Sequence, residues 1–174
     1  MFELILGGAR SGKSAYAETL ARDLRRPVTY VATCVPYDDG MHTRIEQHRA
    51  RRPTEWQTYE VGTQPLDEIL QQLDHPEQLI LVDCMTLWLS QQLMDEHVSL
   101  PTAIDTLCDQ LQRMQADVIL VSGEVGLGVV PMGALTRRFV DELGTLNQRL
   151  AQQADRVWWV VAGLPQCLKG SGTP

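Results

Sequence analysis

Residues 7–14 combine the residue types and the spacing that hold a nucleoside triphosphate. They read Gly-Gly-Ala-Arg-Ser-Gly-Lys-Ser and match the pattern G-x-x-x-x-G-K-[ST] in full. Glycines allow backbone N–H groups to curl around phosphate oxygens, and the positive end of a following helix strengthens the attraction. Lys13 can neutralise the β and γ phosphates, and the Ser14 hydroxyl can bind Mg²⁺. The pattern predicts a phosphate-binding loop made of Gly7, Gly8, Ala9, Arg10, Ser11, Gly12, Lys13 and Ser14.

A carboxylate at the end of a second apolar run could complete a magnesium site with Ser14. Residues 79–83 read Leu-Ile-Leu-Val-Asp, and phosphoryl-transfer proteins hold Mg²⁺ with such an acid at the tip of a neighbouring strand. Asp83 is therefore the first candidate, and Glu124, after the run 118–122, is the second. Asp83 could instead only cap a following helix, because aspartate is a favoured N-cap residue. No Asn-Lys-x-Asp sequence occurs, which excludes a switch GTPase of the Ras type.

Residues 41–53 are locally basic in a chain that is acidic overall. At helical spacing, Arg44, His48 and either Arg51 or Arg52 share one face. A charge run is commonly just a solvated face. Alternatively, the segment handles phosphate, because arginine binds phosphate oxygens through two parallel hydrogen bonds. A neutral histidine among arginines could then attack a phosphorus atom and form a covalent intermediate.

The overall composition excludes other classes of function. The 174 residues carry a net charge of −7, whereas a nucleic-acid or anionic-membrane surface would need a basic excess. No apolar run approaches the roughly 18 residues of a membrane span, and the first residues lack the basic start of a signal peptide. The four cysteines form no C-x-x-C pair, which favours reduced thiols. We expect a cytoplasmic protein without a membrane span or a nucleic-acid partner.

Short apolar runs alternate with helical patterns along the chain. The patterns predict strands at 2–6, 28–33, 79–83, 118–122 and 157–162, and helices at 14–25, 41–52, 65–73, 101–115 and 134–154. In the last helix, a stripe that we expect to face the core contains Leu135, Phe139, Leu143, Leu146 and Leu150. Strands that are apolar without strict alternation are typical of a parallel sheet covered on both faces. The sequence therefore predicts a single α/β domain over residues 1–174, with a mostly parallel sheet, helices on both faces and right-handed crossovers.

Further motifs follow the phosphate loop in an order that matches one known family over nearly the whole chain. They are Val31-Ala32-Thr33, Asp38-Asp39 with Met41, Arg44-Ile45, His48-Arg49 with Arg52-Pro53, Trp56, Glu60, and the stretches 83–89, 124–131, 147–151, 162–165 and Lys169. With these residues the chain resembles the bifunctional adenosylcobinamide kinase/adenosylcobinamide-phosphate guanylyltransferase family of cobalamin biosynthesis. Its His-Arg-x-x-Arg-Pro element is far more specific than a phosphate loop alone.

The resemblance implies a two-step enzyme with a RecA-like P-loop NTPase fold. ATP or GTP would phosphorylate the aminopropanol hydroxyl of adenosylcobinamide, and GTP would then transfer GMP to that phosphate through a covalent intermediate on His48. Mg²⁺ would be held by Ser14 and Asp83. Besides the phosphate loop, the nucleotide contacts implied by the family are Ala32, Thr33, Cys34, Arg49, Ala50, Arg51, Arg52, Glu60 and Asp83. Family members can assemble as trimers, so the resemblance also implies a homo-oligomer.

Two positions depart from the family pattern, and two other functions stay open. Gly40 stands where an acidic residue often precedes Met41, and Gly123 stands where asparagine often precedes Glu124. A single-activity P-loop small-molecule kinase would use Lys13, Ser14 and Asp83 but leave His48 as a surface residue. A non-enzymatic nucleotide switch would use the loop to drive partner binding, and it would have no need of the basic segment.

Overall fold

The computed structural model describes residues 1–33 and 52–171. Within these ranges the strands are β1 (Phe2–Gly7), β2 (Val28–Ala32), β3 (Gln57–Glu60), β4 (Leu79–Asp83), β5 (Asp117–Gly123), β6 (Arg156–Val161) and β7 (Leu164–Lys169). The helices are α1 (Lys13–Asp23), α3 (Leu66–Leu73), α4 (Met85–Met94), α5 (Leu100–Arg113) and α6 (Ala134–Gln153). The predicted helix over 41–52 lies outside the described residues.

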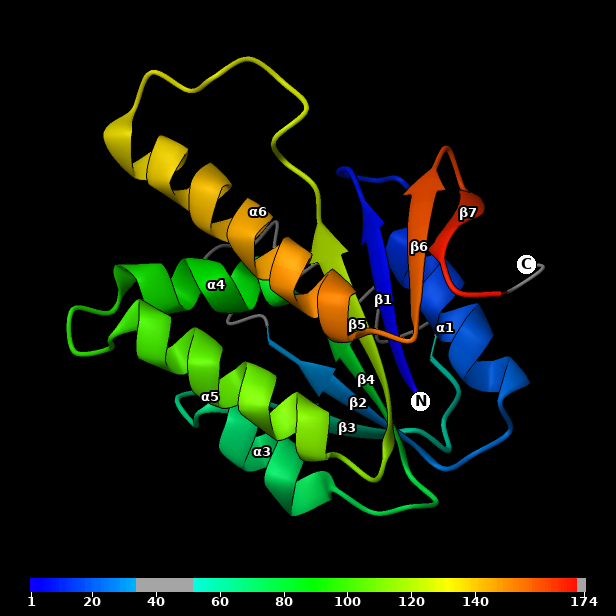
Figure 1. Cartoon of the computed structure of the whole chain (residues 1–174). Coiled ribbons are helices and arrows are strands. Elements are labelled where there is room, and N and C mark those ends of the chain that lie inside the picture. The colour runs from blue at the N-terminus through cyan, green and yellow to red at the C-terminus, as the bar shows by residue number, and fades with distance from the viewer. Residues whose placement is uncertain (34–51, 172–174) are drawn as a thin grey trace.

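One sheet organises the described chain, with the strand order β3-β2-β4-β5-β1-β6-β7. Strands β1 to β6 pair in parallel, and only β7 runs antiparallel to its neighbour β6. Helix α1 lies on one face, and α3, α4, α5 and α6 lie on the other (Figure 1). The predicted α/β class, the mostly parallel sheet and the helices on both faces are confirmed.

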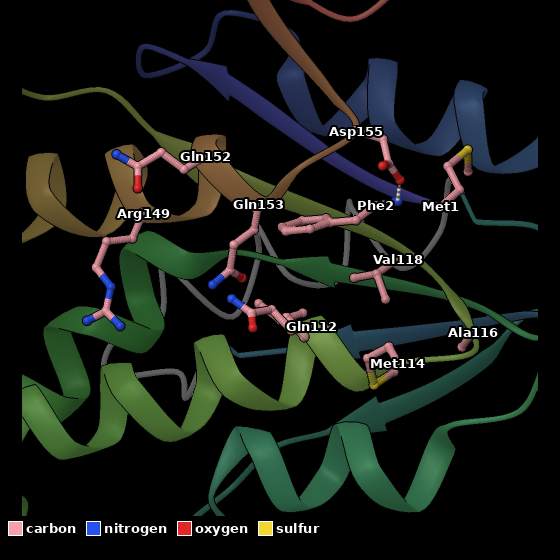
Figure 2. Close-up of a pocket in the computed structure, with 11 residues that line it drawn as sticks. Met1, Phe2, Gln112, Met114, Ala116, Val118, Arg149, Gln152, Gln153 and Asp155 are labelled. Atoms are coloured by element: carbon pink, nitrogen blue, oxygen red, sulfur yellow. Dashed lines mark hydrogen bonds between the residues drawn. The ribbon is translucent and has the colours of Figure 1, made fainter.

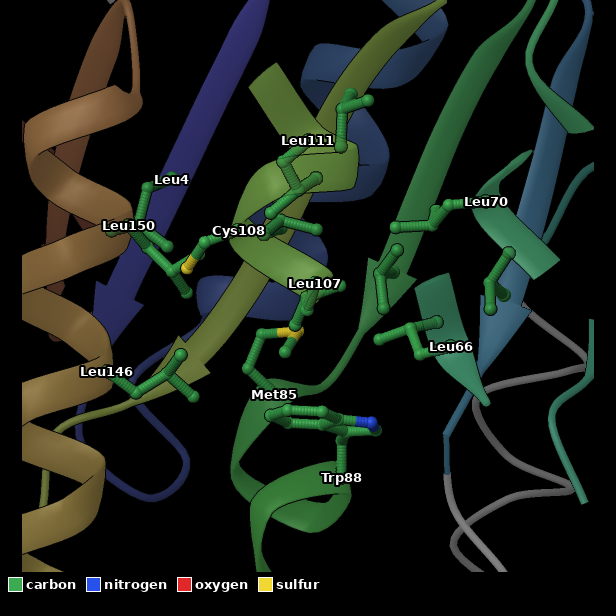
Figure 3. Packing of buried hydrophobic residues seen from close by; sticks show 14 of the residues in the cluster. Leu4, Leu66, Leu70, Met85, Trp88, Leu107, Cys108, Leu111, Leu146 and Leu150 are labelled. Atoms are coloured by element: carbon green, nitrogen blue, oxygen red, sulfur yellow. The ribbon is translucent and has the colours of Figure 1, made fainter. Parts of the chain in front are cut away.

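The sheet is buried on both faces because successive residues of each strand enter opposite cores. Leu4 of β1 belongs to the larger core under α3 to α6, whereas Ile5 belongs to the smaller core under α1. Figure 3 shows side chains of the larger core meeting from β1, α3, α4, α5 and α6. All seven residues of β5 are buried, which explains why its run reads as continuously apolar.

Five predicted strands and four predicted helices are present with small shifts at their ends, but three elements escaped prediction. Strand β3 is short and mostly exposed, so it has no apolar run, and β7 is an exposed edge strand that contains a proline. The run that forms α4 is apolar around most of its circumference and shows no clear helical period.

The predicted stripe on α6 is only partly in the core. Leu143, Leu146 and Leu150 are buried, but Leu135 is 52% exposed because the first turn of α6 extends past the sheet (Figure 1).

The segment between β5 and α6 exposes apolar side chains in succession. Leu127 is 80% exposed, Val129 95%, Val130 74% and Met132 97%. The segment arches away from the carboxyl ends of the strands (Figure 1). Among the described helices, none is long and apolar enough to cross a membrane.

A buried carboxylate ties β1 to β6. The Glu3 side chain is fully buried, Trp158 donates its indole N–H to Glu3 Oε2 at 2.7 Å, and the Arg156 guanidinium pairs with Oε1. The Trp158 ring also packs edge-on against Tyr16 of α1, with ring centroids 5.4 Å apart. A buried charge is tolerated only when it is fully paired, so the three side chains depend on one another.

Glu3→Ala should lower the free energy of unfolding by about 3–5 kcal/mol, because it leaves a buried indole N–H and a guanidinium without their acceptor. Urea unfolding followed by circular dichroism measures the change. Glu142→Ala is the matched control, since its contact with Arg138 is long (3.8 Å) and solvent-exposed, and it should cost less than about 0.5 kcal/mol. Equal losses in both variants would contradict a special role for Glu3.

Candidate active site

The phosphate loop lies between the end of β1 and the start of α1. Lys13 and Ser14 are the first two residues of the helix, and the Tyr16 N–H donates to the Gly12 carbonyl at 2.9 Å. Gly12 adopts a left-handed conformation with φ of 95°, which glycine takes at little cost. Lys13 Nζ folds back and donates to the Gly8 carbonyl at 3.4 Å. The loop, the lysine and the helix N-terminus are thus together, as the sequence predicts.

The turn between β6 and β7 supports the loop from the side. The Gly163 N–H donates to the Ser11 carbonyl at 2.8 Å, and a Cβ on Gly12 would lie only 3.0 Å from Gly163 Cα. A Cβ on Gly7 would lie 2.6 Å from the Val160 carbonyl oxygen. Glycines 7 and 12 are therefore required because neighbouring backbone passes this close. The C-terminal hairpin is part of the site's support.

Asp83 lies at the carboxyl end of β4, two strands from β1. The parallel register pairs Asp83 with Val121 of β5 and with Ala32 of β2. Leu79 and Leu81 of the same strand belong to the core under α1, so the alternating side chains put Asp83 on the face that α1 covers. The N-cap residue of α4 is Cys84, with no capping side-chain hydrogen bond, so Asp83 is not a helix cap. The alternative that it serves only as a cap is wrong.

Tyr30 binds the Asp83 carboxylate. Its phenol, on β2, donates a hydrogen bond to Asp83 Oδ2 at 3.0 Å, and the residue is only 3% exposed. Burial first and the Asp83 charge second raise the pKa of Tyr30 well above its ordinary value. The phenol therefore stays protonated and always donates.

Thr33 fixes the end of β4 to the end of β2. Its hydroxyl donates to the Cys84 carbonyl at 2.7 Å and accepts from the Cys84 N–H at 2.8 Å, and its own N–H donates to the Asp83 carbonyl at 3.3 Å. Burial, and then the Asp83 charge, raise the pKa of the Cys84 thiol to about 11, so it stays neutral. Thr33 thus holds the main chain on which Asp83 sits, and its predicted nucleotide contact stays a prediction.

Arg52 stacks on the ring of Tyr30. Its guanidinium carbon lies 3.3 Å from the centre of the Tyr30 ring, which is a cation–π contact. Its Nε is buried and has no hydrogen-bond partner among the described residues. The arginine is therefore held by the aromatic ring beside Asp83.

Glu124, the second candidate for the metal, follows β5 directly. Its N–H donates to the Gly7 carbonyl at 3.1 Å, and its carboxylate accepts from the Gly126 N–H of its own loop. The neighbouring Gly123 donates to Thr86 Oγ1 at 2.6 Å, and a Cβ there would lie 2.7 Å from that oxygen. The departure from the family pattern at position 123 therefore matches a tight contact with α4.

Ala32 and Glu60 are two further predicted site residues that the structure describes. Ala32 ends β2, and Glu60 ends β3 beside it as an exposed residue. The parallel strands thus bring Gly7, Ala32, Glu60 and Asp83 to one edge of the sheet. The predicted site residues outside the described part of the chain are Cys34, His48, Arg49, Ala50 and Arg51.

The oxygens of Ser14 and Asp83 suit Mg²⁺. Helix α1 packs against β4, so the start of the helix and the end of the strand lie on the same side of the sheet. Mg²⁺ prefers oxygen ligands and takes one or two carboxylates together with water and substrate phosphates. No group of three or more His, Cys, Asp or Glu side chains that could hold a metal occurs within residues 1–33 and 52–171.

A cavity of about 550 Å³ lies at the amino ends of the strands, opposite the ends that carry the phosphate loop and Asp83 (Figure 2). Met1, Phe2 and Ala116 line it near the amino ends of β1 and β5, together with Gln112 and Gln153 from the ends of α5 and α6. It is separated from the phosphate loop by the length of the strands. It therefore plays no part in the candidate site.

Two supporting residues were missed from the sequence. Tyr30 precedes Ala32 by two residues in a predicted strand, so the period of two could have placed it on the same face. Gly163 was noted only as part of a family motif, and nothing local indicates that it touches Gly12. Its contact joins residues about 150 positions apart, which no spacing rule identifies.

A family model and known bifunctional proteins match nearly the whole chain. The family model described as cobinamide kinase / cobinamide phosphate guanyltransferase matches residues 3–168. The bifunctional adenosylcobalamin biosynthesis protein CobP of Pseudomonas aeruginosa is 47% identical over 171 residues, covering 98% of both chains. The bifunctional protein CobU of Escherichia coli is 40% identical over 178 residues, covering 94% of this chain and 97% of its own.

Solved structures share the fold at low sequence identity. The RadB recombinase aligns with a TM-score of 0.51 at 14% identity, covering 91% of this chain and 73% of its own. An ATPase from the type III secretion system of pathogenic bacteria aligns with a TM-score of 0.53 at 11% identity, covering 95% and 56%. These likenesses confirm the predicted RecA-like P-loop fold.

Gly12→Ala should destabilise the protein by about 1–3 kcal/mol and weaken ATP binding, because the new methyl group meets Gly163 and the left-handed backbone disfavours a side chain. Urea unfolding and isothermal titration calorimetry measure the two effects. Gly144→Ala is the control, since a Cβ there meets nothing within 4 Å in the middle of α6, and it should stabilise by about 0.5–1 kcal/mol. A Gly12 variant with wild-type stability would contradict the tight approach.

Proposed function

This chain belongs to the cobinamide kinase / cobinamide phosphate guanyltransferase family, and we propose that it phosphorylates adenosylcobinamide and then joins GMP to the product. It is a bifunctional enzyme of adenosylcobalamin biosynthesis, with relatives that match over nearly the full length of both chains. The observation that carries the proposal is the phosphate loop of residues 7–14, set between β1 and α1, with Asp83 on the same face of the sheet.

In the kinase step the aminopropanol hydroxyl attacks the γ phosphorus of ATP or GTP and releases its proton to water. The new bond joins this oxygen to the phosphorus, the bond to the β-phosphate oxygen breaks, and the nucleoside diphosphate leaves. Such a transfer needs mainly positioning and charge neutralisation. Loop N–H groups and the N-terminus of α1 bind the phosphates, and Lys13 neutralises charge next to the bond that breaks. We propose that Ser14 and Asp83 would hold Mg²⁺, which would neutralise part of the negative charge on the phosphates.

In the guanylyltransferase step we propose that His48 attacks the α phosphorus of GTP and releases pyrophosphate. A phosphate oxygen of adenosylcobinamide phosphate then attacks the same phosphorus, takes the GMP group and frees the imidazole. This double displacement divides one difficult step into two easier ones. The position of Arg52 against Tyr30 supports the proposal. In the sequence, Arg52 follows His48 by only four residues, and Arg52 stacks on Tyr30, whose phenol binds Asp83.

The cysteines of the described chain bear on the compartment in which the enzyme works. Cys84, Cys108 and Cys167 are free thiols, as expected for a reducing compartment, and we propose a cytoplasmic enzyme. Its partners in this proposal are the corrinoid and the two nucleotides, with no nucleic acid.

Incubation with GTP labelled at the α phosphate tests the covalent step. Wild-type protein should carry label that is acid-labile and base-stable after denaturation, as a phosphoramidate does, and His48→Ala should carry none while it keeps part of its kinase activity. His75→Ala is the matched control, since His75 is exposed and lies after α3, and it should label normally.

A kinase assay on Lys13→Ala tests the phosphate-loop assignment. The variant should lose kinase activity at least about a hundredfold, because the charge on the leaving phosphate is no longer neutralised.

In the labelling experiment, label on His48→Ala would place the nucleophile at another residue. No label on the wild type, with kinase activity present, would leave only a single-activity kinase.

We also propose that the exposed apolar segment between β5 and α6 is covered by another copy of the chain in a homo-oligomer such as a trimer. An apolar run of this exposure is costly in water, and patches of this kind commonly mark interfaces. Family resemblance supports the oligomer, and the exposed side chains suggest which segment makes it.

Val129→Lys combined with Met132→Lys should shift the protein to a smaller species, because charged side chains cannot be buried unpaired in an interface. Analytical ultracentrifugation at micromolar concentration measures the mass. Gln72→Lys, at an exposed position on α3, is the control and should leave the mass unchanged. If the double variant keeps the wild-type mass, another surface makes the oligomer.

A further inference from the structure

We propose that Tyr30 is a positioning residue for the metal-dependent step: its phenol fixes the Asp83 carboxylate, and its ring holds the Arg52 guanidinium. This inference rests on the proposed function, because it assigns Asp83 to the metal. It concerns only contacts among residues that the structure describes. No motif in the sequence singles out Tyr30.

The phenol lies where it can set the orientation of the carboxylate. Tyr30 pairs with Leu81 across the two strands, so its side chain reaches diagonally along the sheet to Asp83, which pairs with Ala32. The hydrogen bond to Asp83 Oδ2 is 3.0 Å long. An aspartate at the end of a strand can otherwise rotate about its side-chain bonds. With Oδ2 engaged, Oδ1 remains to bind the metal or its water.

The position of the phenol is itself rigid. Tyr30 is 3% exposed and belongs to the core under α1, and the ladder between β2 and β4 is extended past Ala32 by the contacts of Thr33. Partners that orient a metal ligand typically change metal affinity 10- to 100-fold when they are removed. If Tyr30 served only to fill space, phenylalanine would suit the position better, because burying a hydroxyl costs free energy unless the hydroxyl is hydrogen-bonded.

The Tyr30 ring also holds Arg52, and this contact can be tested separately from the hydrogen bond to Asp83. Arg52 stacks on its face at 3.3 Å, whereas the hydrogen bond to Asp83 leaves from the phenol oxygen. Tyr30→Phe therefore removes the hydrogen bond and keeps the stacking surface. Tyr30→Leu removes both. The difference between the two variants measures what the ring contributes through Arg52.

Calorimetric binding of a non-hydrolysable ATP analogue, with and without Mg²⁺, tests the proposal without turnover. Tyr30→Phe should bind the magnesium complex about tenfold more weakly and the metal-free analogue as the wild type does. In the kinase assay the Mg²⁺ concentration for half-maximal rate should rise by a similar factor, with a smaller loss of kcat at saturating Mg²⁺. Tyr30→Leu should show these changes and also a loss of metal-free binding.

Tyr59→Phe is the matched control, because Tyr59 lies on the neighbouring strand β3 and donates to Gln64 rather than to a site carboxylate. It should leave both affinities unchanged. If Tyr30→Phe is folded and its affinity for the magnesium complex equals that of the wild type, the phenol is only part of the core and the inference is overturned. If the wild type and Lys13→Ala bind the analogue equally, the phosphate-loop assignment fails instead, so the two failures are distinguishable.

Discussion

Parallel pairing of β2, β4, β5 and β1 is the constraint on which the site depends. Because these strands run in the same direction, their carboxyl ends meet at one edge, and the crossover helices leave that edge open to ligands. The phosphate loop and Asp83 come from strands separated by β5 alone, although Asp83 follows Ser14 by 69 positions in the sequence. A shift of one residue in the register of β4 would turn the Asp83 side chain to the opposite face, away from α1.

Strand patterns and a phosphate loop could be recognised from the sequence because each is a local signal. Apolar runs predicted five of the parallel strands, β1, β2, β4, β5 and β6, and correctly placed Asp83 at the end of β4. Edge strands β3 and β7 have no such signal, since most of their residues are exposed. Leu135 followed the helical period and is nevertheless exposed, because period alone does not show where the core ends.

Long-range contacts explain what the sequence could not predict in the site. The need for glycine at position 12 comes partly from its left-handed backbone, which the motif implies, and partly from Gly163 of the final hairpin, which it does not. Likewise, Asp83 is recognisable as an acid after a strand, but Tyr30 becomes relevant only once β2 is known to pair with β4. Residues that support a site from a neighbouring element carry no spacing signature of their own.

Two reactions at one phosphate loop would place different demands on the surrounding chain. Binding by backbone N–H groups and a helix N-terminus depends on phosphate charge and is indifferent to which phosphorus reacts. The choice between the γ and the α phosphorus must therefore come from the nucleophile, which has to approach in line with the leaving oxygen. If the corrinoid hydroxyl and His48 use the same loop, they must approach the bound nucleotide from different directions. A fixed centre formed by the loop, Asp83 and Tyr30 suits this arrangement, because it can stay unchanged while the attacking group differs.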